Sequence, residues 1–119
     1  IPEKYISKVL VKKDELEKNI RLAGLFSSSI ADVNLNCDGK TTTITAKNAD
    51  KGDIKIVVES LLKNEPFNIS LNHYYLLDGL KIIPTEHVVI EYTGPGSPLV
   101  IRPENDNKDL TYLIMPLKR

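Results

Sequence analysis

The sequence is short of the residues from which most enzyme active sites and metal sites are built. Its 119 residues include one cysteine, Cys37, and two histidines, His73 and His87. A lone cysteine cannot form an internal disulfide or a multi-cysteine metal site, and no group of residues has metal-ligand spacing. We therefore expect no cofactor and no metal, and we expect the protein to reside in the reducing cytoplasm.

The chain also lacks an excess of charge of either sign, because 16 lysines and arginines balance 16 aspartates and glutamates. A protein that binds nucleic acid through bulk charge needs a basic excess, so this class is excluded. No apolar run approaches the roughly 18 residues of a transmembrane helix. We also expect no secretory route, because these residues show no charged and then apolar leader segment.

The length suits one domain, which can bury roughly two thirds of its unfolded surface. The only methionine is Met115, and the chain begins Ile1-Pro2-Glu3. We therefore expect residues 1–119 to be a single domain cut from the C-terminal part of a longer chain.

Hydrophobic periodicity predicts a first unit of one strand, one helix and three strands. The Asp38-Gly39 pair predicts a tight hairpin between the second and third strands of this unit. Asp14 is the expected helix N-cap. The unit comprises a strand over Tyr5–Val11, a helix from Asp14 to about Ser27, and strands over Val33–Cys37, Thr41–Ala46 and Ile54–Val58.

A second unit repeats this order, and a shift of 60 residues aligns Val9 with Ile69 and Leu16 with Leu76. Asn72 is the expected cap of its helix. The unit comprises strands over Phe67–Leu71, Val88–Tyr92, Leu99–Ile101 and Leu110–Met115, with the helix over Asn72–Leu80 after the first of them. We predict an α+β fold, a duplicated β-α-β-β-β domain with two helices packed on one face of two antiparallel sheets.

Catalytic groups are few, and each has a structural interpretation. His73 begins a helix, which favours a solvated or capping role, and His87 beside Glu86 is expected at the surface. Cys37 has no neighbouring base. Gly94-Pro95-Gly96 lacks the Lys-Ser/Thr of a phosphate loop and opens no helix.

The C-terminal residues are unusually apolar for a chain end, with Met115, Pro116 and Leu117 in succession. They form either a plain edge strand or part of an exposed apolar patch that binds a partner.

Three segments resemble the C-terminal domain of bacterial DNA polymerase III beta subunits, the sliding clamps, and the resemblance covers essentially the whole chain. They are Tyr112-Leu113-Ile114-Met115-Pro116-Leu117-Lys118-Arg119, Leu71-Asn72-His73-Tyr74-Tyr75-Leu76-Leu77-Asp78, and Pro98-Leu99-Val100-Ile101-Arg102-Pro103. Leu71 stands where the family usually has phenylalanine, and Gly24 where it often has a bulkier apolar residue.

The resemblance implies a DNA replication processivity factor that performs no chemistry. Two three-domain chains close head-to-tail into a homodimeric ring around duplex DNA, without sequence specificity, and tether the polymerase. Helices line the pore of such a ring. The DNA-facing residues would then be Lys12, Lys13, Lys18 and Arg21, and the protein would lie in the bacterial cytoplasm with the nucleoid.

The resemblance also implies two protein-binding sites. Short peptides of the DNA polymerase III alpha subunit, the clamp loader and other clamp-binding proteins would enter a groove formed by Asn72, Tyr75, Pro98, Leu113, Ile114, Met115, Pro116, Leu117 and Lys118. The joint with the second clamp chain would contain Gly24, Leu25, Phe26, Ile54 and Ile56.

Two other function classes remain open at this point. One is a small-ligand or catalytic α+β domain that uses His73, Tyr74, Tyr75 and Glu86 in a cleft. The other is a generic protein-interaction domain without the clamp role. A concave pocket with perturbed titratable groups favours the first, whereas a shallow apolar channel beside the C-terminal strand favours a clamp.

Overall fold

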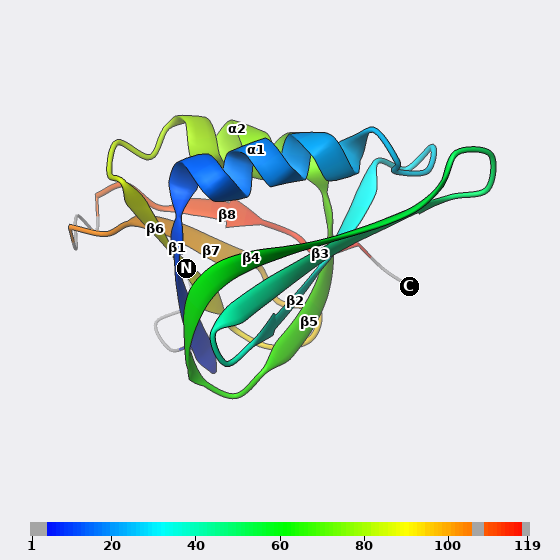
Figure 1. The fold of residues 1–119 in the computed structure, drawn as a ribbon. Coiled ribbons are helices and arrows are strands. Elements are labelled where there is room, and N and C mark those ends of the chain that lie inside the picture. The colour runs from blue at the N-terminus through cyan, green and yellow to red at the C-terminus, as the bar shows by residue number, and fades with distance from the viewer. Residues whose placement is uncertain (1–4, 106–108, 118–119) are drawn as a thin grey trace.

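A computed structural model describes residues 5–105 and 109–117 of the chain (Figure 1). Both predicted β-α-β-β-β units are confirmed. The first contains β1 (Ser7–Lys12), α1 (Lys13–Gly24), β2 (Asp32–Asp38), β3 (Thr41–Asn48) and β4 (Gly52–Asn64). The second contains β5 (Phe67–Asn72), α2 (His73–Lys81), β6 (His87–Tyr92), β7 (Leu99–Pro103) and β8 (Tyr112–Ile114).

The first strand of each unit pairs with a strand of the other unit. β1 pairs with β6 of the second unit, and β5 pairs with β2 of the first unit, both antiparallel. The strand order is therefore β5-β2-β3-β4-β1-β6-β7-β8, in which β4 and β1 join the two four-stranded halves. The join is narrow, because β1 pairs with β4 only from Ser60 to Asn64.

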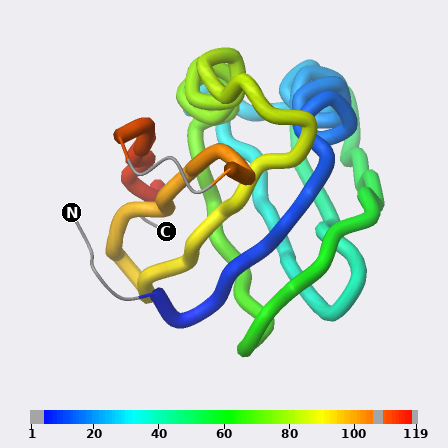
Figure 2. The backbone as a smooth tube through the Cα atoms, turned by 90° about the vertical axis from the view of Figure 1, so that its left-hand side faces the viewer, coloured from blue at the N-terminus to red at the C-terminus, as the bar shows by residue number. Residues whose placement is uncertain are grey.

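Both helices cover the same face of the strands and lie side by side (Figures 1 and 2). Leu16 and Ile20 of α1 and Leu76 and Leu80 of α2 are fully buried against the inward side chains of the strands. This burial of apolar surface is the main stabilising term of the domain. At the far end of the core, Phe67 of β5 stacks on Tyr92 of β6, with ring centroids 4.4 Å apart.

The ends of the elements differ from the prediction in several places. α1 begins at Lys13, so the expectation that Asp14 is its N-cap is wrong. Lys12 occupies that position without a side-chain bond, and Asp14 lies in the first turn, where its charge favours the helix dipole. α1 ends at Gly24 instead of about Ser27, because Leu25 and Phe26 donate to carbonyls three residues earlier.

The caps and turns of the second helix and first hairpin follow the sequence. Asn72 Oδ1 accepts hydrogen bonds from the amides of Tyr74 and Tyr75, at 2.9 and 3.4 Å, as predicted. Gly39 has a φ of 57° in the two-residue loop between β2 and β3, which explains the glycine there. No helix within the described residues is long and apolar enough to cross a membrane.

Candidate protein-binding sites

The C-terminal strand β8 lies at one edge of the sheet and presents two exposed apolar side chains. Leu113 is 42% exposed and Met115, just after the strand, is 61% exposed. Ile114 between them is buried and belongs to the core, so its side chain lies beneath this surface. The physical reason is the strand period of two, which turns every second side chain inward.

The chain beyond β8 is held in place against the other half of the sheet. The Leu117 amide donates a hydrogen bond of 2.9 Å to the carbonyl of Ser70 in β5. The apolar tail therefore bridges from β8 towards β5, and Pro116 and Leu117 are half-buried. Lys118 lies outside the described residues.

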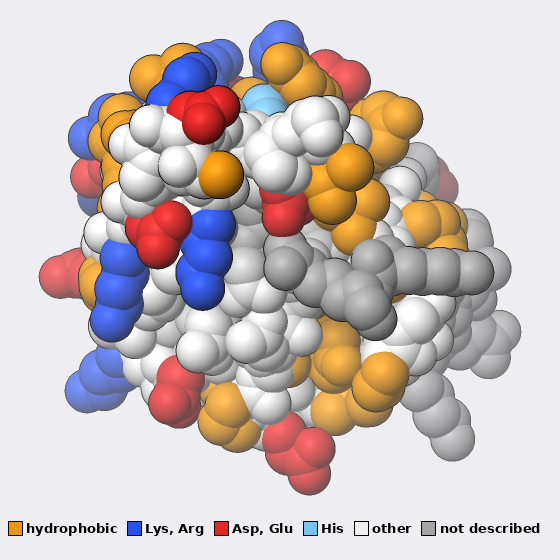
Figure 3. Space-filling view, turned by 90° about the vertical axis from the view of Figure 1, so that its right-hand side faces the viewer, with side chains coloured by type: hydrophobic (Ala, Val, Ile, Leu, Met, Phe, Trp, Pro, Cys, Tyr) orange, Lys and Arg blue, Asp and Glu red, His pale blue; other side chains and the backbone are white. Residues whose placement is uncertain are grey.

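The first turn of α2 and the start of β7 lie near this tail. Tyr75, in that turn, is 56% exposed. Pro98 directly precedes Leu99, which pairs with Ile114, so Pro98 lies at the same end of the β7–β8 ladder as Met115. Figure 3 views the end of the molecule where α1 finishes and α2 begins, and hydrophobic side chains gather on its right half.

Tyr112 supports this surface from beneath and was missing from the predicted groove. A Cβ at Gly79 would overlap the Tyr112 ring, so glycine lets the ring pack under α2. Burial, with Asp78 and Tyr75 nearby, raises the pKa of the Tyr112 hydroxyl. The arrangement is an apolar and aromatic surface, which suits an apolar peptide segment.

A second candidate surface surrounds the end of α1. Leu25 is 64% exposed, and Phe26 is partly buried against the core. The β3–β4 hairpin reaches over this end, where Asn48 Nδ2 donates to the Ser27 carbonyl (3.0 Å) and Lys51 Nζ to the Leu25 carbonyl (3.3 Å). The structure therefore brings together the end of α1 and the start of β4.

The first half of β4 has a free backbone edge. Its residues Gly52–Glu59 pair with β3 on one side, whereas pairing with β1 begins only at Ser60. We call Gly52–Glu59 the open edge. Within it Ile54 and Ile56 face the core and are half-buried, so the exposed apolar side chain is Val57, which is 58% exposed.

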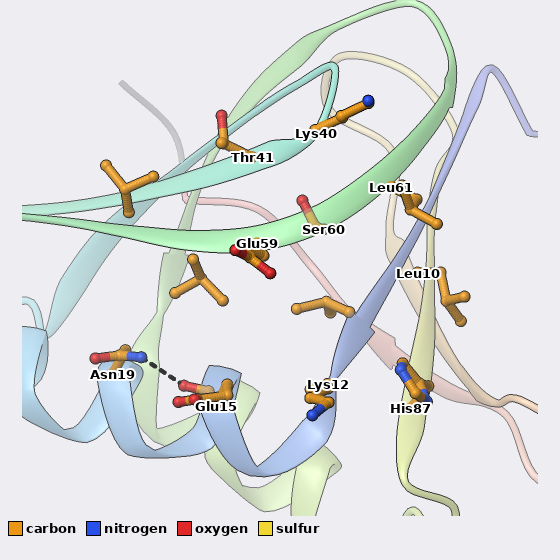
Figure 4. A pocket seen from close by; sticks show the side chains of 13 residues that line it. Leu10, Lys12, Glu15, Asn19, Lys40, Thr41, Glu59, Ser60, Leu61 and His87 are labelled. Carbon is orange, nitrogen blue, oxygen red and sulfur yellow. Dashed lines mark hydrogen bonds between the residues drawn. The ribbon is translucent and has the colours of Figure 1, made fainter.

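A pocket of about 830 Å³ lies beside the open edge, between β4, β1 and α1 (Figure 4). Val57, Glu59, Lys12, Glu15 and Asn19 are among its lining residues. The sequence analysis placed Ile54 and Ile56 of this edge at the joint but did not foresee the pocket, because β4 was expected to end at Val58, before Glu59–Leu61 of the lining. The residues after Val58, Glu59-Ser60-Leu61-Leu62, do not alternate polar with apolar types, so no local signal extended the strand.

Gly24 has a role in the packing of the two helices. A Cβ on this residue would lie 2.9 Å from the imidazole ring of His73, so glycine permits the close approach of the two helices. His73 is buried, which overturns the expectation of a solvated or capping role. Its Nε2 lies 3.2 Å from Ser27 Oγ.

The four basic residues expected to face DNA are not equivalent. Lys13 Nζ donates to the Ile83 carbonyl (2.9 Å), which ties the start of α1 to the end of α2 and leaves Lys13 half-buried. Lys18 and Arg21 pair within α1 with Glu15 and Glu17, each at 3.2 Å. Lys12 is exposed beside the pocket.

The residues considered for catalysis do not form a cleft. His73 begins α2, whereas Glu86 follows the other end of that helix, so the two lie at opposite ends of it. Cys37 is buried, and its burial raises the pKa of the thiol to about 11, which leaves it inert at neutral pH. Within the described residues no group of three or more histidine, cysteine, aspartate or glutamate side chains could hold a metal ion.

Comparison of the sequence with models of known protein families identifies the family of this chain. The sequence model of the family "DNA polymerase III beta subunit, C-terminal domain" matches residues 1–118. The chain belongs to this family. The expected fold and the expected family of beta-subunit domains are therefore confirmed.

Relatives of this beta-subunit domain include the beta sliding clamps of Staphylococcus aureus and Bacillus subtilis (strain 168). They are 25% identical over 120 and 122 residues, which are 98% and 99% of this chain. Each match covers 32% of the relative, so the chain spans about a third of the length of the curated relatives it matches.

Solved structures agree with the fold of the domain. The DNA polymerase III beta subunit of Thermotoga maritima is 26% identical, with a TM-score of 0.95 over 100% of this chain and 32% of that one. A DNA polymerase sliding clamp from Pseudomonas aeruginosa is 22% identical, with a TM-score of 0.93 over 100% of this chain and 33% of that one. The second likeness concerns the fold alone.

Proposed function

We propose that this chain works as the C-terminal domain of a three-domain sliding clamp, a non-catalytic processivity factor that tethers DNA polymerase III to duplex DNA. The observation that carries this is the family match over residues 1–118 together with the duplicated fold. In a ring built from such domains, the face with both helices would line the pore. A balanced charge suits this role, because a tight grip on phosphates would hinder sliding.

The open edge of β4 is the proposed joint with a second clamp chain. An unpaired strand edge binds an extended segment through backbone hydrogen bonds, and neighbouring side chains supply specificity. Leu25, Phe26 and Val57 would supply the apolar contact there. Ile54 and Ile56 would hold the strand against the core, and Gly24 would position the end of α1.

The surface around β8 is the proposed groove for peptides of the polymerase III alpha subunit, the clamp loader and other clamp-binding proteins. Its exposed anchors are Tyr75, Leu113 and Met115. Asn72, Pro98, Pro116, Leu117 and Lys118 would form its margins, and Ile114 would support it from the core. Binding to the isolated chain should be weak, because ordering a free peptide costs free energy and the preceding domain would supply the other wall.

The contact with DNA is proposed to be loose and independent of sequence. Lys12, Lys18 and Arg21 would face the duplex from the side of α1. The ion pairs of Lys18 and Arg21 with glutamates are exposed and worth little, so either cation can turn towards a phosphate.

The test is retention on DNA. The domain is joined to the two preceding domains that a three-domain clamp requires, loaded onto nicked circular plasmid, and followed by gel filtration before and after the plasmid is linearised. A clamp stays with the circle and is lost from the linear form. Equal retention on both forms would mean direct binding to DNA and would refute the topological role.

A further inference from the structure

The outer face of the sheet, on the side away from the helices, carries an apolar and basic surface at the join of the two halves. Leu10 of β1 lies directly opposite both Leu61 of β4 and Val89 of β6. Ile6, Lys8, Leu10, Leu61, Lys63 and Val89 form this leucine–lysine face. We propose that it is a docking surface for an acidic segment of a partner protein that carries aliphatic side chains.

The apolar side chains of this face are accessible. Leu61 is 59% exposed and Ile6 is 39% exposed, and Leu10 and Val89 are half-buried. They are not scattered singly, because the register places Leu61, Leu10 and Val89 in one row across three neighbouring strands. Figure 4 shows Leu61 and Leu10 beside each other where β4 meets β1. We take this row of exposed and half-buried apolar side chains as the apolar part of the docking surface.

The fold itself does not require leucines on this face, and the duplicated architecture provides the comparison. On the outer face of the other half, Asn34 lies opposite Thr45 and Ser70, and Asn36 lies opposite Thr43. Asn34 Nδ2 donates to Ser70 Oγ (3.0 Å) and to Asn68. That half is a polar, self-bonded face, so an outer face of this fold is stable without exposed leucines.

The positive charges of Lys8 and Lys63 on the leucine–lysine face favour an anionic partner. Lys8 and Lys63 lie directly opposite each other on β1 and β4, and like charges in that position repel. Within residues 5–105 and 109–117, neither ammonium group has a carboxylate at ion-pair distance. Glu91 lies opposite Lys8 on β6, but its Oε1 is held by Arg102 Nε at 3.2 Å.

The docking surface is separate from the proposed peptide groove and adjoins the proposed ring joint, because Leu10 and Leu61 also line the pocket beside the open edge. The open edge ends at Glu59, two residues before Leu61, and the joint is proposed to use its backbone groups, whereas the leucine–lysine face would bind through side chains. Leu113 and Met115 lie at the far edge of the sheet, since β6 and β7 stand between β1 and β8. The inference therefore does not depend on the role of the groove.

The experiment titrates the isotope-labelled chain with a peptide of about eight residues, a strand's length, in which leucine and aspartate alternate. We expect saturable shifts of the methyl resonances of Leu10, Leu61 and Val89. We also expect affinity to fall about tenfold or more as salt rises from about 50 to about 500 mM, because exposed charges are screened. A peptide that alternates leucine and lysine serves as the charge control and should not bind.

Charge reversal provides the decisive variant. The Lys8→Glu, Lys63→Glu double variant should lose the acidic peptide and bind the basic one, whereas Lys47→Glu with Lys81→Glu, at exposed lysines away from this face, should change neither. Leu61→Ser should weaken binding about tenfold, and Leu22→Ser, at another exposed leucine, should not. The proposal would be overturned if the Lys8/Lys63 variant bound the acidic peptide unchanged or if both peptides bound equally. It would also be overturned by the absence of any shift at millimolar peptide, or by shifts confined to Met115 or the open edge.

Discussion

Gly24 in α1 and the imidazole ring of His73 in α2 lie in direct contact, so that a Cβ on Gly24 would come within 2.9 Å of His73 Cε1 and Nδ1. This contact sets the separation of the two helices at the end where the proposed ring joint and the proposed peptide groove both begin. Glycine here serves close packing. The first two predictions concern this pair.

Gly24→Ala should destabilise the domain by about 1–3 kcal/mol, because the added methyl group overpacks the helix contact. The higher helix propensity of alanine offsets about 1 kcal/mol at most. Urea unfolding measures the change. In a His73→Ala background the same substitution should be neutral or stabilising, so an equal loss in both backgrounds would show that the ring is not the obstacle.

The stability of the domain should fall as the pH drops below about 6.5. Ser27 Oγ donates its one proton to the Gly24 carbonyl (2.9 Å), so His73 Nε2 must donate to Ser27. His73 Nδ1 is then a buried lone pair without a hydrogen-bond partner among the described residues. Burial lowers the pKa of His73, and Asp32 opposes this shift.

The sign follows from linkage. Above about pH 6.5 the ring is neutral in both states, so stability is unaffected. Between that pH and the lower pKa of the folded state, the unfolded chain binds the extra proton and stability decreases. Urea unfolding at several pH values should show this slope in the native chain and a smaller slope in His73→Gln. An NMR titration of His73 with a pKa at or above about 6.5 would contradict the assignment.

Substitution of Leu25 by alanine together with Val57 by aspartate should open the proposed ring while the domain stays folded. Both side chains are more than half exposed, so their loss affects an interface more than the core. Buried interface anchors are worth about 2 kcal/mol or more each. Phe26 is a poorer target because it packs against the core. Sedimentation of the three-domain chain measures the dimer constant, with Ile82→Asp as the exposed control at the end of α2.

The two neighbours Ile114 and Met115 should respond in opposite ways. Met115→Ala should weaken a peptide that carries a glutamine, a leucine and a Leu-Phe pair, with little change in stability, because its side chain is 61% exposed. Ile114→Ala should lower stability by about 2–5 kcal/mol, because it leaves a core cavity. Peptide titration by NMR and urea unfolding separate the two effects. If Met115→Ala bound normally while Tyr75→Ala did not, the groove would have to exclude β8.

The sequence was sufficient for the local features of this domain. The alternation in Val33–Cys37, the Asp38-Gly39 turn and the Asn72 cap depend on neighbouring residues, and each was predicted correctly. The burial of His73 was missed because Gly24, 49 positions earlier, creates the space for its ring. The length of β4 was missed because its last residues pair with β1, and pairing between distant segments leaves no local signature.

The exchange of first strands between the two units has a consequence for how the chain can come apart. A cut between Glu65 and Pro66 would leave one piece without β5, the partner of β2, and the other without β1, the partner of β6. The first piece would keep β2-β3-β4-β1 and the second β6-β7-β8, and each would lack a strand that covers its apolar side chains. The two pieces should be unstructured alone and fold only on mixing, as in fragment complementation. Because the first strand of each unit pairs with the other unit, the two units should unfold together in one cooperative step.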